Sequence, residues 1–491
     1  MFSAIIPNAI CATSSIRNLM PQNIGPAALE RDAARAASAI RGASDVLVVA
    51  HIDADGISAA AIAARTLERL NKKFSVTFLK KLDEYAVSEI NKSPASLVWF
   101  VDLGSGYLSM ISRQNVIVAD HHVPDGEWMS GQTSLFDFSG LVHVNPHNNK
   151  MDGAGEISGA GVTYVISKAV DPDNIDLAYL AVIGASGDVQ DQDGKGFRGY
   201  NRSILGDAAA RGDVEAMDDL RLFGRETRPL IQFLQYCNDP VIPGITSDYM
   251  GCTGLFTGLN IELKNCDGSW RSWTDLTCDE KDAVKISLIE ILNASGSSAE
   301  RLMGEVYTLP KFEKGSELRD AREFATLLNS CGRYDDAPIG LRICLNDKNA
   351  LNDAKHNRSE HRKQLSIALN YIKQSNIIRR RDFIQFFHAR NEIRDTIVGI
   401  AAGMILGTEG VGIDLPLIAF ANADDGVKVS ARADKTLVLR GLDLSAAVKK
   451  AAEQVGGYGG GHNIAAGATI PAGTEYQFLK IIETIVEEQI T

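Results

Sequence analysis

The sequence is poor in cysteine and contains no Cys-x-x-Cys pair. Its seven Cys residues are an odd number in a chain of 491 residues, which argues against a disulfide framework and against a zinc ribbon. Unpaired thiols are typical of a reducing compartment. Cys252, Cys266 and Cys278 lie near one another in sequence, but their spacing fits no usual zinc pattern. We therefore expect them to be buried thiols.

Long apolar runs are absent as well. No stretch reaches the about 20 consecutive apolar residues that a membrane-spanning helix needs. The segment Met1–Pro7 has no basic residue before its short apolar run, and Pro7 interrupts that run, so we expect no signal peptide. These features predict a cytoplasmic protein without a membrane partner.

A net positive charge is also missing, since 62 acidic residues outnumber 50 basic ones and the formal net charge is -12. This balance argues against uniform coating of nucleic acid, although it is compatible with a local basic groove. The hydrophobic share of 45% and the charged share of 23% are ordinary for a globular protein. The length predicts two or three domains, each able to bury its own core.

Strand-like and helical segments alternate in the first part of the chain. A helix is expected at residues 26–41, with Pro26 at its start and Gly42 after its end. Further helices are expected at 57–70, 82–91, 158–170 and 175–185. The expected strands are Val46–Ala50, Phe74–Leu79, Leu97–Leu103, Val116–Ala119 and Leu141–Val144. This alternation predicts an α/β fold with a doubly wound parallel sheet.

Residue types that bind metal ions follow several of these segments. They are His51, Asp53 and Asp55, then Asp102, then Asp120, His121 and His122, and finally Asp188. Ligands of α/β proteins bind at the carboxyl ends of parallel strands, and carboxylates with imidazoles suit Mn²⁺ or Mg²⁺. Asp53 and Asp55 alone are explained equally well as caps of the next helix, and a lone Asp after a strand is usually a cap or a turn. Their recurrence at successive segment ends favours a metal site.

The same residues carry a family resemblance. The ordered set His51-x-Asp53-x-Asp55-Gly56, Asp102, Asp120-His121-His122 and Gly187-Asp188 resembles the DHH phosphoesterase superfamily. That superfamily includes RecJ exonucleases, small-oligonucleotide phosphodiesterases and manganese pyrophosphatases. One departure is Val49, which stands where many members have a metal-site His, whereas His51 lies closer to the first Asp of the motif.

Other segments narrow the resemblance to the RecJ branch. Asn145-Pro146 and Ser158–Val162 resemble that branch between its third and fourth motifs. The run Gly459–Gly467 resembles the glycine-rich signature of the DHH-associated domain, which the pyrophosphatases lack. The best match is to the archaeal RecJ-like proteins, a group that includes nucleases associated with the GINS replication complex.

The resemblance implies a single-strand-specific exonuclease with two divalent cations about 4 Å apart, Mn²⁺ before Mg²⁺. The expected ligands are His51, Asp53, Asp55, Asp102, His121 and Asp188. We expect Asp102 to bridge the ions because it leaves the middle of the sheet, Asp120 to orient His121, and His122 to contact the scissile phosphate. The implied partners are single-stranded nucleic acid and the GINS complex, in DNA replication or repair.

Two other functions stay open. One is a phosphodiesterase of short oligonucleotides or cyclic dinucleotides. The other is a non-catalytic scaffold of the replication fork, because eukaryotic relatives of the archaeal group have lost their metal ligands. The acids are intact in this sequence, which favours activity.

Residues 205–375 have a different character, with helical periodicity and no catalytic motif. Helices are expected near Glu215–Leu222, Pro229–Tyr236, Asp279–Leu292 and Leu318–Leu328. This part is either a helical spacer or a surface for a partner. We therefore divide the chain into a DHH domain at 1–204, a mainly helical inserted domain at 205–375 and a DHH-associated domain at 376–491.

Basic residues are enriched between Lys355 and Arg394. Arg379, Arg380 and Arg381 stand beside Phe386, and basic side chains with aromatic rings suit the phosphates and unstacked bases of a single strand. A solvated helix face followed by a strand with core Phe residues explains the same pattern. We expect a substrate groove here.

The last part of the chain predicts a smaller mixed α/β domain. Helices are expected at 395–406, 445–454 and up to about 488, and strands at 415–421, 427–431 and 465–470. A glycine-rich turn, Gly459 to Gly461, precedes His462, and its N–H groups are expected to bind an anion. It lacks the Lys-Ser or Lys-Thr of a P-loop and follows a helix, unlike a dinucleotide loop. The resemblance implies that Ser430 and Arg432 share the bound phosphate.

Overall fold

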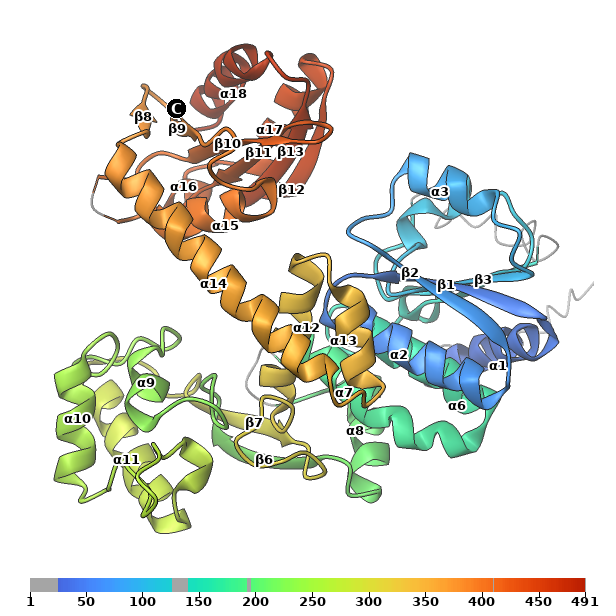
Figure 1. The fold of residues 1–491 in the computed structure, drawn as a ribbon, viewed down its shortest axis with the longest axis horizontal. Coiled ribbons are helices and arrows are strands. Elements are labelled where there is room, and N and C mark those ends of the chain that lie inside the picture. Colours follow the sequence, from blue (N-terminus) through green and yellow to red (C-terminus); the bar gives the residue numbers. More distant parts are fainter. Residues whose placement is uncertain (1–24, 126–139, 192–195, 409, 491) are drawn as a thin grey trace, which may run out of the picture. The chain divides into compact units, whose positions relative to one another are not determined.

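The structure, a computed structural model, describes residues 25–125, 140–191, 196–408 and 410–490. The segment Met1–Pro7, for which we expected no signal peptide, lies outside the described residues. The chain forms two compact units, Met1–Ala325 and Thr326–Thr491 (Figure 1). Our division at 204/205 and 375/376 stays a prediction. Within the described ranges, no helix combines the length and the apolar character that crossing a membrane requires.

The first unit contains the expected parallel sheet. Its strand order is β2-β1-β3-β4-β5, and every neighbouring pair is parallel. The strands are β1 Asp45–His51, β2 Lys73–Leu79, β3 Leu97–Val101, β4 Val116–Ala119 and β5 Leu141–Val144. The fold class predicted from the sequence is therefore confirmed for this part of the chain.

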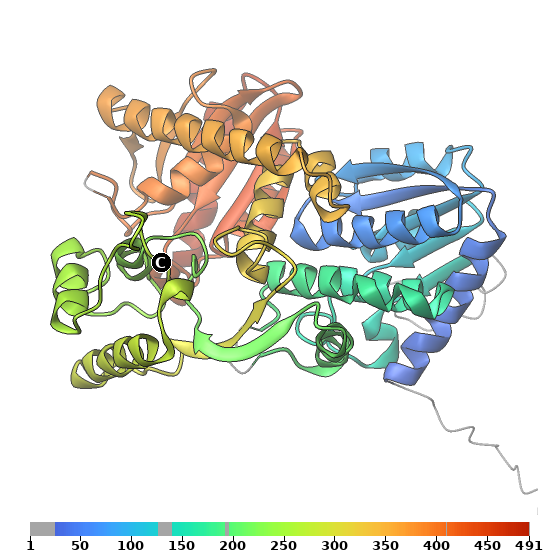
Figure 2. The same cartoon turned by 60° about the horizontal axis from the view of Figure 1, so that its bottom comes forward.

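Helices cover both faces of this sheet, as Figure 2 shows for the blue and teal part of the chain. Val98 and Phe100 pack towards α3 (Glu84–Asn91) and the short helix η1 (Ser105–Met110). The opposite face is covered by α2 (Ala54–Arg69) and α6 (Gly159–Val170). The outer helices are α1 (Pro26–Gly42), α7 (Ala178–Gly187) and α8 (Gly199–Ala210). Burial on both faces explains why these strands read as continuous apolar runs.

The inserted segment of the first unit has its own core. A two-stranded antiparallel sheet, β6 (Glu215–Leu220) and β7 (Met303–Thr308), flanks a helical cluster around Phe233, Phe256 and Trp273. Its helices are α9 (Leu230–Gln235), α10 (Tyr249–Gly258) and α11 (Cys278–Ala294), and α12 (Ala321–Arg333) follows.

Two expectations for this segment are wrong. Residues 215–220 form a strand and not a helix, because they pair with β7 along their full length. Most of β6 is solvent-exposed, so the apolar pattern carries little information and pairing decides the structure. Cys252 is buried as expected, but Cys266 and Cys278 are exposed.

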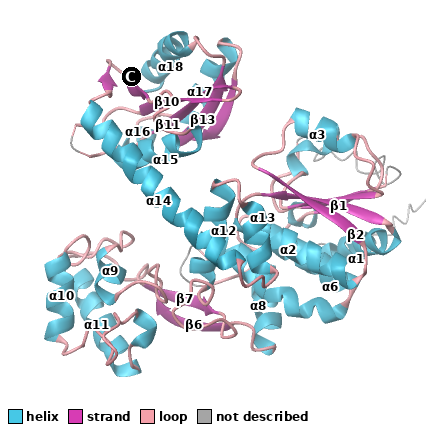
Figure 3. Cartoon of the chain, viewed as in Figure 1, coloured by secondary structure: helices cyan, strands magenta, loops and turns pink. Residues whose placement is uncertain are grey.

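The second unit is a mixed sheet between helices (Figure 3). The strand order is β12-β13-β11-β10-β9-β8; only the β9–β10 pair is parallel. The strands are β8 Arg379–Arg380, β9 Gln385–His388, β10 Leu417–Ala423, β11 Gly426–Arg432, β12 Tyr458–His462 and β13 Ala465–Ile470. The helices are α13 Ala337–Cys344, α14 Ala350–Ser375, α15 Asp395–Ile405, α16 Lys435–Leu439, α17 Leu444–Gln454 and α18 Glu475–Ile490.

Two separate cores lie on the two faces of this sheet. Helices α14 and α15 pack on one face, and α17 and α18 pack on the other. The expected glycine-rich turn at Gly459–Gly461 is instead part of β12, paired in register with β13. Glycine is a weak strand former, so the partner strand and not local preference determines this conformation.

Candidate metal centre and substrate-binding face

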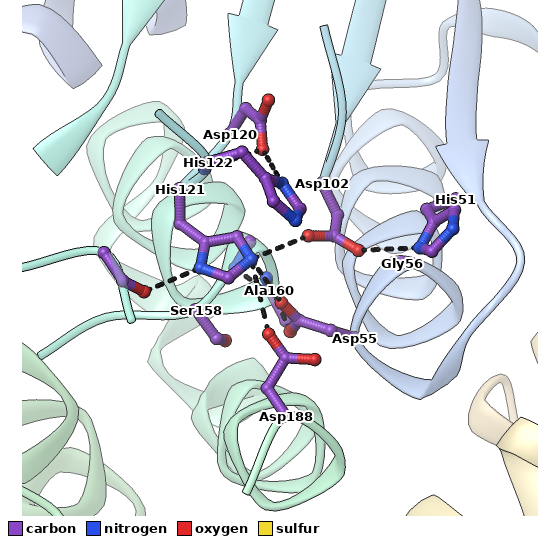
Figure 4. Close-up of polar contacts among 12 residues, drawn as sticks. His51, Asp55, Gly56, Asp102, Asp120, His121, His122, Ser158, Ala160 and Asp188 are labelled. Atoms are coloured by element: carbon purple, nitrogen blue, oxygen red, sulfur yellow. Dashed lines mark hydrogen bonds and ion pairs between the residues drawn. The ribbon is translucent and has the colours of Figure 1, made fainter. Parts of the chain in front are cut away.

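The expected metal ligands lie together at the carboxyl-terminal edge of the parallel sheet (Figure 4). Their donor atoms form overlapping groups in which all atoms lie within 4.8 Å of one another. One group is His51, Asp53 and Asp102, a second is Asp55, His121 and Asp188, and a third is Asp102, Asp120, His121 and His122. The structure therefore brings together all eight residues that the sequence singled out for this site.

His121 presents one ring nitrogen to the acids. Its Nδ1 lies 2.7 Å from the carbonyl oxygen of Gly153, and because a carbonyl only accepts, Nδ1 carries a proton. Its Nε2 lies 3.3 Å from Asp102 Oδ1, 3.3 Å from Asp188 Oδ2 and 3.9 Å from Asp55 Oδ2. A carbonyl that fixes the far nitrogen of the ring is the usual arrangement for a metal-binding His.

Asp102 stands between the two groups of ligands. It directly follows β3 and has a φ of 61°, a left-handed conformation that Asp adopts more readily than most residues. Its Oδ1 faces His121, and its Oδ2 lies 3.6 Å from His51 Nδ1. A Cβ at Gly159 would come within 2.3 Å of Asp102 Oδ1, so glycine is needed there to make room for the carboxylate.

The two acids after β1 have different environments. Asp53 is the N-cap of α2, and its side chain accepts a 2.9 Å hydrogen bond from the Gly56 N–H, so the capping interpretation is right for this residue. Asp55 is buried and accepts hydrogen bonds from the N–H groups of Gly159 at 2.6 Å and Ala160 at 3.0 Å. The carboxylate of Asp55, a residue of α2, therefore lies at the N-terminus of α6, where the helix dipole favours a negative charge.

Asp120 orients His122 and not His121, which corrects our expectation. Its Oδ1 lies 2.8 Å from His122 Nδ1, and its Oδ2 accepts a 2.8 Å hydrogen bond from the Ser105 N–H. Burial raises the pKa of Asp120, but the bond to His122 outweighs it and lowers the pKa to about 2. The His122 side chain is 58% exposed, so it faces the solvent-accessible side of the site.

Four buried polar atoms of this site make no well-aligned hydrogen bond among the described residues and have only ion-pair contacts with one another or with Asp53 and Asp188: His51 Nδ1, Asp102 Oδ1 and Oδ2, and His121 Nε2. Buried polar atoms are rarely left unsatisfied, because each costs about 1–3 kcal/mol. Imidazole nitrogens and carboxylate oxygens are suitable ligands for Mn²⁺ or Mg²⁺. The residues present therefore fit divalent cations.

The pKa shifts of the site residues also favour a bound cation. Burial, and then the charge of Asp102, raise the pKa of Asp188 to about 7 and that of Asp55 well above its usual value. Burial lowers the pKa of His51, but Asp102 and Asp53 outweigh it and raise the pKa to about 11. Such a crowd of carboxylates attracts a cation, whose binding displaces the protons.

Sequence reasoning missed several supporting residues. Gln190 donates from Nε2 to the Gly153 carbonyl at 2.9 Å, the same oxygen that fixes His121. Asn145 donates from Nδ2 to the His122 carbonyl at 2.9 Å and to Ser105 Oγ at 2.9 Å. The only sequence signal for Asn145 is its place in the family resemblance. The Gly153 carbonyl has no sequence signature, because any residue supplies one.

In the second unit, the expected substrate-binding residues share one face of β11, β13 and β12. Ser430 pairs with Gly467, which pairs with Gly460. Two positions along, Arg432, Ala465 and His462 form the next row of the register. Residues two apart in a strand point to the same face, so Ser430, Arg432, Gly460 and His462 lie on one side of the sheet.

The three glycines of β12 have different roles. A Cβ at Gly459 would lie 2.8 Å from Ala468 Cβ, and one at Gly461 would lie 2.6 Å from the Ala465 carbonyl oxygen. A Cβ at Gly460 would meet nothing within 4 Å among the described atoms. Packing therefore requires Gly459 and Gly461, whereas Gly460 leaves the opposite face of the strand flat and open.

Arg432 is the charged group of this face. Burial lowers its pKa, and among the described residues it has no ion pair; its hydrogen bond goes to the Ala431 carbonyl at 2.8 Å. A Cβ at Gly399 of α15 would lie 2.9 Å from Arg432 Nη2, so the helix leaves space for the guanidinium. A partly buried arginine without a carboxylate partner suits an anionic ligand.

The arginine cluster Arg379–Arg381 is not part of this face. It lies in and just after β8, at the opposite edge of the sheet from β12. Arg380 pairs with Asp414, and Arg381 lies 3.0 Å from Glu483. The Arg381 guanidinium also covers the ring of Phe386 at 5.3 Å, and Phe386 packs against the core. The structure thus partners two of the three charges internally and does not join them to the Gly460 face.

Comparisons with known proteins agree with this architecture. Three family models match: the DHH family, N-terminal domain at residues 45–184, the DHH-CID domain at 222–305 and the DHHA1 domain at 383–488. An uncharacterized protein of Methanocaldococcus jannaschii is 28% identical over 451 residues, 91% of this chain and 94% of the relative.

Solved structures with a similar fold include RecJ from Thermus thermophilus in complex with Mn²⁺. It is 18% identical with a TM-score of 0.53, and the match covers 94% of this chain and 55% of that one. CDC45 from Entamoeba histolytica is 12% identical with a TM-score of 0.60, over 94% of this chain and 99% of that one. The chain thus spans about half the length of the Thermus RecJ. At these identities the likeness concerns the fold.

Proposed function

We propose that the chain is a RecJ-like member of the DHH phosphoesterase superfamily, and that it is a metal-dependent exonuclease that hydrolyses single-stranded nucleic acid from an end; the matches to the DHH, DHH-CID and DHHA1 domains support this proposal. The observation that carries this proposal is the buried carboxylate of Asp102, whose two unsatisfied oxygens face His121 and His51. Its position between two groups of ligands supports a shared ligand of two cations.

Each residue of the site has a role in this proposal. His51 and Asp53 would hold one ion, Asp55, His121 and Asp188 would hold the other, and Asp102 would touch both. When bound, such ions supply Lewis-acid stabilisation of the phosphate charge and a nucleophile at neutral pH. The chain itself contributes His122. Asp120 binds Nδ1 of this ring, and the exposed part of the His122 ring would contact the scissile phosphate or the leaving group.

The second unit would bind substrate away from the bond that is cut. The flat strand at Gly460 allows the close approach of a phosphate, and Arg432 supplies positive charge beside Ser430. His462 shares the row of Arg432 and adds a donor. Arg379, Arg380, Arg381 and Phe386 stay a proposed contact for longer strands, with Arg379 the exposed member that has no ion pair among the described residues.

A second candidate is a phosphodiesterase of short oligonucleotides or cyclic dinucleotides. The internal pairing of Arg380 and Arg381 favours it, because a long groove needs charges that are available to phosphates. The intact acids argue against a scaffold without activity. We place the enzyme in the cytoplasm, in replication or repair with GINS as a partner, on the strength of the archaeal RecJ resemblance.

The test is hydrolysis of 5′- and 3′-labelled single strands of graded length in Mn²⁺ and in Mg²⁺. The proposal predicts stepwise shortening from one end, for DNA, RNA or both, and loss of turnover in Asp102→Asn. Cleavage confined to the shortest oligonucleotides would support the second candidate. If the folded protein cleaves no strand with either metal, the exonuclease proposal is wrong.

A further inference from the structure

The turn that follows Asp188 has a backbone conformation that its sequence disfavours. Helix α7 ends in a Schellman motif, in which the Gln190 N–H donates to the Ala185 carbonyl at 3.0 Å and the Val189 N–H to the Ser186 carbonyl at 3.2 Å. The position occupied by Val189 is usually Gly, because its φ is positive, here 54°. A β-branched residue is strained there, and its side chain, 44% exposed, gains little from packing.

Two arginines hold the next acid of this turn. Asp191 is 1% exposed, and Arg322 Nη2 donates to its two carboxylate oxygens at 2.9 and 2.8 Å. Arg221 Nη2 lies 3.1 Å from Asp191 Oδ2 and donates to the Asp191 carbonyl at 2.7 Å. Arg221 directly follows β6, and Arg322 is the second residue of α12. Arg221 of the inserted segment and Arg322 of the following helix therefore both bind a turn of the DHH domain.

The same turn carries two contributions to the metal centre. Asp188 is a proposed ligand, and Gln190 binds the Gly153 carbonyl that fixes His121. We propose that Asp191 is a positioning residue: held by Arg221 and Arg322, it keeps the strained turn in the form that presents Asp188 and supports His121. This inference rests on the proposed metal centre, and it makes the inserted segment necessary for full metal affinity.

The inference predicts an unequal effect on the two ions. Asp188 and His121 share one ligand group with Asp55, whereas His51 and Asp53 belong to the other group, and their described hydrogen bonds and ion pairs do not involve the turn. Loss of the arginine contacts should therefore lower the affinity for the ion at Asp188 and His121 about tenfold, which is the usual effect of removing a residue that supports a ligand. The affinity of the other ion should change by less than about twofold.

The test is calorimetric titration of the full chain with Mn²⁺. Arg322→Gln should lower the affinity for one of the two Mn²⁺ ions about tenfold. Adding Val189→Gly to the same chain should restore that affinity, because glycine adopts the conformation of the turn without strain. Arg202→Gln is the matched control. Arg202 also joins the DHH domain to the inserted segment, donating to Glu305 of β7 at 2.8 and 2.9 Å. Because its hydrogen bonds do not involve the turn, both affinities should stay unchanged.

The outcomes separate this inference from the function it builds on. If wild type binds no pair of ions, the metal centre itself is wrong, and this inference falls with it. If wild type binds two ions and Arg322→Gln binds them equally well, only the positioning role is wrong. An equal loss in Arg202→Gln, or no recovery with Val189→Gly, would show that the arginine acts through general stability, which also overturns the proposal.

Discussion

Replacing Asp102 with Asn tests the metal centre because it removes a charge and keeps the shape of the side chain. Asp102 has a φ of 61°, and Asn is among the few residues other than Gly that adopt this conformation readily. Asp102→Ala would add backbone strain of about 1–2 kcal/mol to the loss of the charge. The Asn variant therefore reports on the ligand, and the Ala variant reports on ligand and backbone together.

In the presence of Mn²⁺, Asp102→Asn should lose the free energy of unfolding that both ions contribute, because the two Asp102 oxygens face different ligand groups. At free Mn²⁺ of 100 times the Kd, one ion adds about 2.7 kcal/mol to the free energy of unfolding, so two ions add about 5 kcal/mol. Without metal, the variant should be close to wild type in stability. It loses the attraction of Asp102 to His121 and His51 but also the repulsion of Asp102 from Asp55 and Asp188.

The measurement is unfolding in a series of Mn²⁺ concentrations, with calorimetry for the number of ions bound. Asp53→Asn is the matched control, since Asn also caps a helix and Asp53 belongs to one ligand group only. It should weaken one ion, whereas Asp102→Asn should weaken both and lower turnover by orders of magnitude. If Asp102→Asn bound two ions with wild-type affinity, Asp102 would not be the shared ligand.

Three other results are expected. Gly460→Val should weaken binding of a single strand without changing metal content or stability, because a Cβ there meets none of the described atoms within 4 Å; lost metal with intact strand affinity would reverse this assignment. Arg432→Gln should reduce the slope of log affinity against log salt by about 0.7, the contribution of one phosphate contact on a single strand. Arg380→Gln, already paired with Asp414, should leave the slope nearly unchanged, and an equal reduction in both variants would argue for a groove at β8. Burial, and then the charge of Asp320, raise the pKa of Glu323 from 4.5 to about 7, so the folded state binds its proton more tightly than the unfolded state. Its contribution to stability is complete below pH 4.5 and is lost towards pH 7, by up to about 3 kcal/mol; Glu323→Gln should remove that decline in urea titrations at several pH values, and an unchanged decline would exclude Glu323 as its source.

The parallel sheet could be predicted from sequence because its strands are buried on both faces. Each strand then appears as a short apolar run, and the structure places β4 and β5 at the residues expected. The ligands were found for a related reason. Parallel strands end at one edge of the sheet, so Asp102 and His121 meet there although the sequence separates them.

The secondary-structure predictions were wrong where a local sequence pattern fits more than one structure. The exposed residues of β6 carry no periodic burial, so the helical assignment had no support from packing. The run Gly459–Gly461 is typical of a turn, yet pairing with β13 extends it. The groove expected at the basic cluster stays a prediction; the sequence shows these arginines but not the acidic partners of two of them, Asp414 and Glu483.

The ligand-bearing turns show a further limit of sequence reasoning. Asp102 and Val189 both have positive φ, although neither is glycine, and this conformation decides where the carboxylates of Asp102 and Asp188 point. Strained residues persist only where the surrounding structure holds them. The Asp102 N–H donates to the Ala119 carbonyl at 2.8 Å, and the turn at Val189 is held through Asp191 by Arg322. The residue types at a metal centre can thus be read from a sequence, whereas their orientation depends on distant contacts that the sequence does not display.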